Sequence, residues 1–290
     1  MNQATHSLAG RSHQSFAVEK FRTMHQSGCF ALPNPWDVGT AVFLQHLGFE
    51  ALATTSSGFA FTQGLPDTVT AVNRDAMLGH IREVAEATPL PVNADFQTGY
   101  ADEPEGVAAN VALCIATGVA GLSIEDATGN NETPLYEERL AIERIKAARA
   151  AIDASGIPVI LTARCEAWLV GHSDPLRVSL ERLVAYAEAG ADCLYAPGVS
   201  EPDEIAQIVK AVSPKPVNVL ASRPNPALSL SRLGDLGVRR VSVGSALSRV
   251  AWGAFIRSAR SLKETGTFDS FADAAPFNEL DDLFSKRMKE

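Results

Sequence analysis

Apolar and polar residues follow two distinct patterns along the chain between positions 30 and 261. Short apolar runs predict buried strands, and longer segments with apolar residues at every third or fourth position predict amphipathic helices. The two patterns alternate at intervals of about 25 to 40 residues, which is typical of strand-helix units. Eight strands are predicted, at residues 30–32, 51–54, 92–95, 121–124, 159–163, 193–195, 217–220 and 240–243.

Each predicted strand is followed by a predicted helix, at residues 38–47, 74–87, 104–117, 136–154, 176–189, 202–212, 228–236 and 246–261. Several of these helices end at a glycine, such as Gly48 and Gly118, which can take the left-handed conformation that closes a helix. Eight such units without a break in composition predict a single α/β domain with the (β/α)8 TIM barrel fold. We expect this domain to span residues 15–290, behind a flexible N-terminus at residues 1–14.

A further amphipathic segment lies beyond the eighth unit, at residues 278–288. Its apolar residues Leu280, Leu283, Phe284 and Met288 recur at three- and four-residue steps. Because the predicted barrel is already complete, we expect this segment to dock on a neighbouring subunit. The sequence thus predicts a homo-oligomer, either a dimer or a tetramer.

Composition narrows the classes of function. The net charge of -9 argues against a nucleic-acid partner, because phosphate binding requires clustered basic residues. No apolar run approaches the roughly 20 residues of a membrane span, and the polar start does not look like a signal peptide. The four cysteines are scattered without metal-binding spacing and are expected to be reduced thiols. An acidic cytoplasmic enzyme is the simplest interpretation.

Three predicted strands end next to charged residues. Asp95 ends the third strand, Glu125 follows the fourth and Arg164 follows the fifth. The carboxyl ends of barrel strands form the reactive rim, so these side chains are expected to meet there. A cation held by the two acids, with Arg164 beside it, suits a substrate that is a carboxylate or becomes an oxyanion.

Seven short motifs support a resemblance to a known family, at residues 34–41, 57–60, 64–67, 95–100, 118–126, 163–164 and 187–192. In their order and spacing, the chain resembles the isocitrate lyase/phosphoenolpyruvate mutase superfamily over residues 34–261. The resemblance implies a Mg²⁺ ion, or Mn²⁺, that binds a small 2-oxo acid or its enolate. It also implies that a C–C or P–C bond forms or breaks beside it, and that paired subunits exchange the last barrel helix, here part of residues 246–261.

The resemblance assigns a metal site. Asp95 matches the direct metal ligand, while Glu125 and Asp67 match acids that hold metal-bound waters. Gln97 stands where the family commonly has a second aspartate. Its amide oxygen can still accept a hydrogen bond from a metal-bound water but carries no charge. We therefore expect weaker metal binding or a more anionic substrate.

The resemblance also assigns substrate-binding residues. A loop at Ser57, Gly58 and Phe59 matches one whose backbone N–H groups hold substrate oxygen atoms, although an ordinary turn is an equally good interpretation. Arg164 matches an arginine that grips a carboxylate or the reacting oxygen, and an ion pair with Glu125 or Glu166 is compatible with that role. Trp36 and Tyr100 are candidates for the pocket wall, although plain packing is at least as good an interpretation for an aromatic residue there, and Asn218 is a further candidate for substrate binding.

Missing residues discriminate between reactions. Residues 127–135 contain no cysteine, lysine or histidine, whereas the lyases of the family carry an acid/base cysteine there and the mutases a lysine. No lysine follows a predicted strand, which excludes a Schiff-base aldolase. These absences favour a reaction whose main barrier is enolate formation, such as decarboxylation of an oxaloacetate-like 2-oxo acid.

Three other functions remain open from the sequence. The first is C–C cleavage of a 2-hydroxy acid, as in isocitrate or methylisocitrate lyases, which would need Glu125, Tyr100 or a metal-bound hydroxide as the base. The second is phosphonomutase or hydrolase chemistry at a P–C bond. The third is a protein that binds a 2-oxo acid without converting it.

Overall fold

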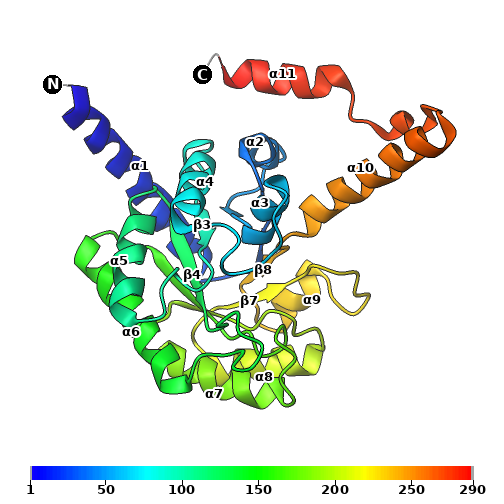
Figure 1. Cartoon of the computed structure of the whole chain (residues 1–290). Coiled ribbons are helices and arrows are strands. Elements are labelled where there is room, and N and C mark those ends of the chain that lie inside the picture. The colour runs from blue at the N-terminus through cyan, green and yellow to red at the C-terminus, as the bar shows by residue number, and fades with distance from the viewer. Residues whose placement is uncertain (1, 289–290) are drawn as a thin grey trace.

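Eight parallel strands form the centre of the molecule, and helices surround them (Figure 1). The computed structural model describes residues 2–288. The strands are β1 (Phe30–Leu32), β2 (Leu52–Ala53), β3 (Val92–Asp95), β4 (Gly121–Glu125), β5 (Ile160–Arg164), β6 (Cys193–Tyr195), β7 (Val217–Leu220) and β8 (Arg240–Ser242). They coincide with the eight predicted strands, with ends that differ by one residue at most.

The strands pair in the order β1-β8-β7-β6-β5-β4-β3-β2. The two outer members of this order are joined by hydrogen bonds, because Ala53 N donates to Pro33 O at 3.0 Å and Asn34 Nδ2 donates to Thr54 O at 2.8 Å. The sheet is therefore a nearly closed barrel, which confirms the predicted (β/α)8 fold. All carboxyl ends of the strands face one rim, so residues at the ends of β3, β4 and β5 come together there.

The helices alternate with the strands. They are α1 (Asn2–Met24), α2 (Val38–His46), α3 (Ser56–Thr62), α4 (Arg74–Glu86), α5 (Pro104–Ile115), α6 (Glu138–Ser155), α7 (Pro175–Glu188), α8 (Pro202–Val212), α9 (Leu230–Asp235), α10 (Ala246–Thr265), the 3₁₀ helix η1 (Asp269–Asp273) and α11 (Phe277–Arg287). The sequence pattern did not predict α1, α3 or η1. Within residues 2–288, no helix is long and apolar enough to span a membrane.

Helix α1 begins at Asn2 and so includes most of the segment predicted to be flexible, and the flexibility of residues 1–14 stays a prediction. Its second half packs against the amino-terminal end of the barrel. Gln14 Nε2 donates to Ile115 O at 2.8 Å and to Val119 O at 3.0 Å, and Phe21 is fully buried. A Cβ atom on Gly121 at the start of β4 would lie 2.9 Å from the Phe21 ring, so this position requires glycine. Helix α1 thus closes the end of the barrel opposite the carboxyl rim.

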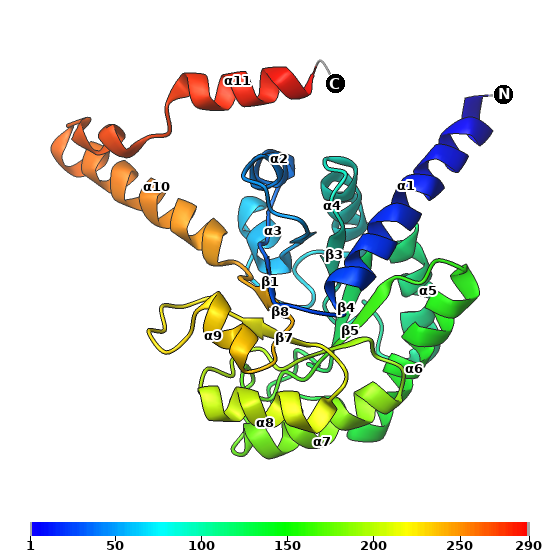
Figure 2. The same ribbon diagram turned by 180° about the vertical axis from the view of Figure 1, so that it is seen from behind.

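The C-terminal helices form an arm that leaves the barrel. Figures 1 and 2 show α10 running outward and α11 turning back past α2. Ser248 is the single buried residue of α10, and Val250 and Phe255 are 69% and 61% exposed. Leu283 and Phe284 of α11 pack partly on the barrel of their own chain, whereas Met288 is 90% exposed. Exchange of this arm between subunits stays a prediction.

Candidate active site

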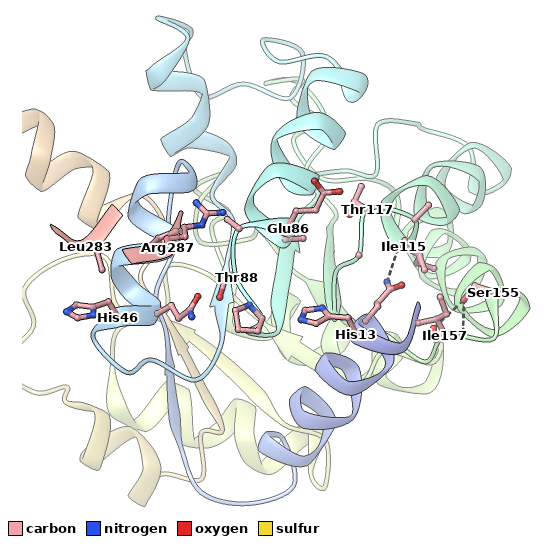
Figure 3. A pocket seen from close by; sticks show the side chains of 18 of the residues that line it. His13, His46, Glu86, Thr88, Ile115, Thr117, Ser155, Ile157, Leu283 and Arg287 are labelled. Atoms are coloured by element: carbon pink, nitrogen blue, oxygen red, sulfur yellow. Dashed lines mark hydrogen bonds between the residues drawn. The ribbon is translucent and has the colours of Figure 1, made fainter. Parts of the chain in front are cut away.

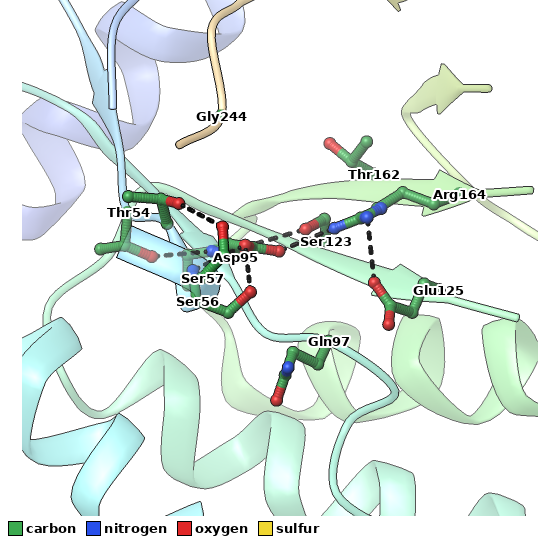
Figure 4. A network of polar contacts seen from close by, with 12 residues as sticks. Thr54, Ser56, Ser57, Asp95, Gln97, Ser123, Glu125, Thr162, Arg164 and Gly244 are labelled. Carbon is green, nitrogen blue, oxygen red and sulfur yellow. Dashed lines mark hydrogen bonds and ion pairs between the residues drawn. The ribbon is translucent and has the colours of Figure 1, made fainter. Parts of the chain in front are cut away.

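Asp95, Glu125 and Arg164 converge at the carboxyl rim, because β3, β4 and β5 are neighbours in the barrel. Arg164 Nη1 lies 2.7 Å from Asp95 Oδ1, and its Nη2 lies 3.0 Å from Glu125 Oε2. The three side chains are 10% to 19% exposed. Figure 4 shows them as one network at the ends of the strands. The predicted meeting of two acids and an arginine is therefore present.

The second oxygen of Asp95 is held by the start of α3. Ser56 donates to Asp95 Oδ2 from its backbone N at 2.9 Å and from its Oγ at 2.8 Å (Figure 4). Asp95 N in turn donates to Thr54 Oγ1 at 2.9 Å. A carboxylate at a helix N-terminus is stabilised by the free N–H groups and the helix dipole. The position of Asp95 is therefore fixed from β2 and α3 as well as from β5.

Ser57, Gly58 and Phe59 lie in the first turns of α3, not in the loop that the sequence predicted. Thr55 is the N-cap residue, and its Oγ1 accepts from Gly58 N at 3.2 Å. The first four N–H groups of a helix have no partner within the helix. Ser57 N is one of these, and Ser57 lines the cavity at the rim. A helix N-terminus thus replaces the predicted loop as the source of N–H donors.

Gly58 is required for packing. A Cβ atom there would lie 2.5 Å from Thr55 Cγ2 and 3.1 Å from Trp36 Cβ. Phe59 stacks on His80 with ring centroids 4.0 Å apart. Neither Trp36 nor Phe59 lines the cavity at the rim in the described structure. Trp36 therefore packs close to Gly58, and Phe59 joins α3 to His80 of α4.

Gln97 and Tyr100 bind each other across a tight turn. Tyr100 Oη donates to Gln97 Oε1 at 2.8 Å, and both residues have positive φ angles, of 57° and 45° respectively. In Figure 4 the Gln97 side chain points away from Asp95 and Glu125. Burial and the nearby carboxylates raise the pKa of Tyr100 well above its ordinary value, so its phenol stays protonated at neutral pH. The structure does not bring these two residues to the reaction site.

Glu166 was missed as a functional candidate in its own right. Its Oε1 lies 2.8 Å from Arg164 Nε, so all three nitrogens of the guanidinium face carboxylates. The backbone N of Glu166 donates to Asp126 Oδ1 at 2.8 Å, and Asp126 is itself paired with Arg182 at 2.9 Å. The sequence did contain a signal for Glu166, because it lies two residues after Arg164. In an extended chain, side chains two residues apart point to the same face.

The acids outnumber the arginine at this rim. Burial raises the pKa of Glu125 from 4.5 to about 8, and nearby Glu166 and Asp95 add to this while Arg164 opposes it. Burial also raises the pKa of Glu166. The pKa of Asp67 is raised by burial and by the charge of Asp95. A cation placed among these groups would favour their ionised forms.

A cavity of about 200 Å³ opens at this rim. Its walls include Ser57, Asp67, Asp95, Arg164 and Asn218, which are five of the predicted site residues. A larger cavity of about 1100 Å³ lies elsewhere, between α1, α2, the C-terminal ends of α4 and α5, and α11 (Figure 3). That cavity contains none of the strand-end residues. We therefore place the chemistry at the smaller one.

Comparison with known proteins identifies the family. A model of the phosphoenolpyruvate phosphomutase family matches residues 21–263, which is most of the chain. The chain belongs to this family. The resemblance to the isocitrate lyase/phosphoenolpyruvate mutase superfamily is thereby confirmed. As a member of this superfamily, the protein is an enzyme of the lyase and mutase class.

Individual relatives agree with this assignment. A crystal structure described as a lyase/mutase of Burkholderia cenocepacia J2315 is 48% identical, with a TM-score of 0.90 over 94% of this chain and 97% of the other. An uncharacterized protein of Mycobacterium tuberculosis (strain ATCC 25618 / H37Rv) is 34% identical over 90% of this chain and 94% of that protein. The 2-methylisocitrate lyase of Escherichia coli (strain K12) is 31% identical over 59% of this chain and 58% of that protein.

The raised pKa of Glu125 predicts how stability depends on pH in this family member. Because the folded-state pKa of about 8 exceeds the ordinary 4.5, the proton on Glu125 contributes stability that is lost as pH rises through this window. Glu125→Gln imitates the protonated acid and should remove that loss. In urea unfolding with EDTA, wild type should match the variant near pH 4.5 and become less stable than it above pH 8. Parallel pH profiles would contradict the prediction.

Proposed function

We propose that this enzyme is a Mg²⁺-dependent carbon–carbon lyase that decarboxylates a small oxaloacetate-like 2-oxo acid through an enolate. One observation carries the proposal. The rim combines the Asp95, Glu125 and Arg164 network with a neighbouring loop, residues 127–135, that holds no cysteine, lysine or histidine. Decarboxylation fits such a site, because the departing CO₂ needs no proton from the protein.

The donor set suits a hard divalent cation. Mg²⁺ keeps several waters and needs only one or two protein carboxylates. Asp95 would hold the ion directly, with Glu125 and Asp67 holding its waters, and Mn²⁺ fits the same oxygen donors. Among the side chains that the structure describes, no three His, Cys, Asp or Glu are placed to hold a metal ion between them. When bound, the cation would neutralise negative charge that develops on the 2-oxo oxygen.

The residues of the chain would orient the substrate for bond cleavage. Arg164 and the N–H groups at the start of α3 would hold its carboxylate and 2-oxo oxygens in one plane. The bond between C3 and C4 then breaks, its electron pair moves toward the 2-oxo oxygen, and CO₂ leaves with the enolate of pyruvate behind. Solvent supplies the proton that converts this enolate to pyruvate.

Cleavage of a 2-hydroxy acid is a second candidate, and one observation favours it. With a pKa of about 8, Glu125 can accept a proton near neutral pH, as retro-aldol cleavage requires. The Escherichia coli relative is named a 2-methylisocitrate lyase. This reaction would release a 2-oxo acid such as glyoxylate or pyruvate together with a second carboxylic acid and no CO₂, and the absence of CO₂ separates it from decarboxylation.

A panel of 2-oxo and 2-hydroxy acids would test both candidates. Each compound is incubated with Mg²⁺ or Mn²⁺, and CO₂, pyruvate and glyoxylate are measured. We expect turnover of an oxaloacetate-like acid that EDTA abolishes and added Mg²⁺ restores. Turnover that resists EDTA would contradict the metal dependence. Thermal stabilisation by a 2-oxo acid without any product would instead indicate a binding protein.

We also propose that the enzyme is a homo-oligomer held together by the C-terminal arm, α10 to α11. Its exposed apolar residues, such as Val250 and Phe255, need a partner surface. Truncation after Thr267 should lower the oligomeric mass seen by sedimentation before helix content falls in circular dichroism. A monomeric full-length protein, or a truncated form of unchanged mass, would contradict this.

A further inference from the structure

Arg240 is a buried cation that pairs with no acid among the described side chains. It is 2% exposed and lies in the interior of the barrel on β8. Its Nε donates to Asn218 Oδ1 at 2.8 Å and its Nη2 to Thr162 Oγ1 at 3.0 Å. Its Nη1 makes longer contacts, at 3.4 Å to His25 Nε2 and 3.5 Å to Asn93 Oδ1. All four partners are neutral, and no carboxylate of the described side chains forms an ion pair with it.

His25 is a neutral neighbour of Arg240. Burial, followed by the charge of Arg240, lowers the pKa of His25 from 6.5 to about 3, so its ring is neutral. Its Nδ1 lies 2.7 Å from Phe21 O and must donate there, which leaves Nε2 as an acceptor for Arg240. A buried charge is normally paired with an opposite charge, because removing it from water is costly. Arg240 therefore lacks the counter-ion that such a position normally contains.

Arg240 lies on the wall of the same cavity as Asp95 and Arg164. Asn93 and Thr162, its neighbours, precede Asp95 and Arg164 by two residues on β3 and β5. That step is roughly 6.6 Å along a strand. The terminal carbons of a four-carbon dicarboxylate are about 4 Å apart. A hydrogen bond of about 3 Å at one end of the dicarboxylate accounts for the rest of the distance between the level of Asp95 and Arg164 and the level of Asn93 and Thr162.

We propose that Arg240 binds the distal carboxylate of the substrate, and that it determines specificity for dicarboxylates. This inference rests on the proposed function, which places the 2-oxo or 2-hydroxy acid end at Asp95. The acidic groups at the rim repel a second carboxylate, and the unpaired guanidinium attracts it, so charge alone orients the substrate along the barrel axis. Asn218 would act by positioning Arg240, since it already accepts from Arg240 Nε and donates to Ser242 Oγ at 2.9 Å.

The test uses three stable ligands with wild-type enzyme and Mg²⁺. Malate carries the distal carboxylate, its 4-amide replaces this group with a neutral one of the same shape, and lactate lacks the group. Calorimetry should show malate binding about 100-fold more tightly than the 4-amide. Equal affinities would overturn the inference. If lactate binds but malate and its 4-amide bind with the same affinity, the proposed function stands and only the role of Arg240 fails. If none of the three binds, both fail.

The Arg240→Met variant distinguishes the role of Arg240 in binding from that of Arg164. The variant should bind malate and its 4-amide equally, while its affinity for lactate with Mg²⁺ stays that of wild type. Its ligand-free melting temperature should not fall, because an unpaired buried charge is removed. A marked loss of stability with an unchanged preference for malate would show that Arg240 only ties β8 to α1, and would overturn the proposal. Should Arg240→Met not fold, Arg240→Lys keeps the charge and should retain a reduced preference for malate. Complete persistence of this preference would count against a fork-shaped contact. Its complete loss would count in favour of such a contact.

Discussion

Replacing Asp95 by asparagine should lower the turnover number by about 1000-fold, the scale of losing a charged group at the reacting centre. The side chain keeps its size, and Ser56 can still donate to the remaining amide oxygen. Arg164 keeps Glu125 and Glu166 as partners. The melting temperature should therefore change little, while Mg²⁺ affinity measured by calorimetry falls steeply.

Asp203→Asn is a suitable control, because Asp203 is an exposed acid in the first turn of α8 that does not line the cavity at the rim. It makes the same chemical change and should leave turnover and metal affinity intact. If Asp95→Asn retained more than a tenth of the wild-type activity, Asp95 would not be the central metal ligand. If the variant failed to fold, the loss of activity would not count in favour of the site.

Removal of Arg164 should have the largest effect on stability. Arg164→Met leaves Asp95, Glu125 and Glu166 facing one another without a cation. Breaking a buried ion pair in this way costs about 3–5 kcal/mol in the free energy of unfolding. The variant should also be inactive. Because burial raises the pKa of both Glu125 and Glu166, protonation at lower pH should relieve the repulsion, and the deficit should shrink as pH falls from 8 toward 5.

Arg177→Met provides the matched control. Arg177 also contacts two acids, Asp174 and Glu181, but its side chain is 58% exposed. Ion pairs at an exposed surface contribute little to stability, so urea unfolding should show little change and no comparable dependence on pH. Equal destabilisation by the two substitutions would show that burial of the acid cluster is not the source of the effect.

Strand periodicity was sufficient to predict the barrel and the meeting of Asp95, Glu125 and Arg164. All strands of a parallel barrel end at one rim, so a charge at a strand end is placed by the fold class alone. The same reasoning does not extend to residues in turns. Gln97 and Tyr100 lie in a turn with positive φ angles, and these angles, which no pattern of apolar residues encodes, direct Gln97 away from the acids.

Tertiary context also explains the remaining differences. The Thr55 side chain caps α3, so the segment at Ser57 becomes helical although it is too short to show helical periodicity. Helix α1 is stabilised in its second half by segments distant in the chain, because Gln14 donates to Ile115 O and Val119 O and Phe21 lies next to Gly121. Arg240 follows a predicted turn at Gly237 and gave no sign in the sequence that its side chain enters the barrel.

The products formed from oxaloacetate test the proposed function most directly. Oxaloacetate labelled with ¹³C at every carbon is incubated with enzyme and Mg²⁺, and NMR measures its products against a control with Mg²⁺ alone. The proposed function predicts equal amounts of pyruvate and CO₂ at a rate above this control, with EDTA removing the excess. Products from cleavage of another bond, or a rate no greater than that of Mg²⁺ alone, would contradict it.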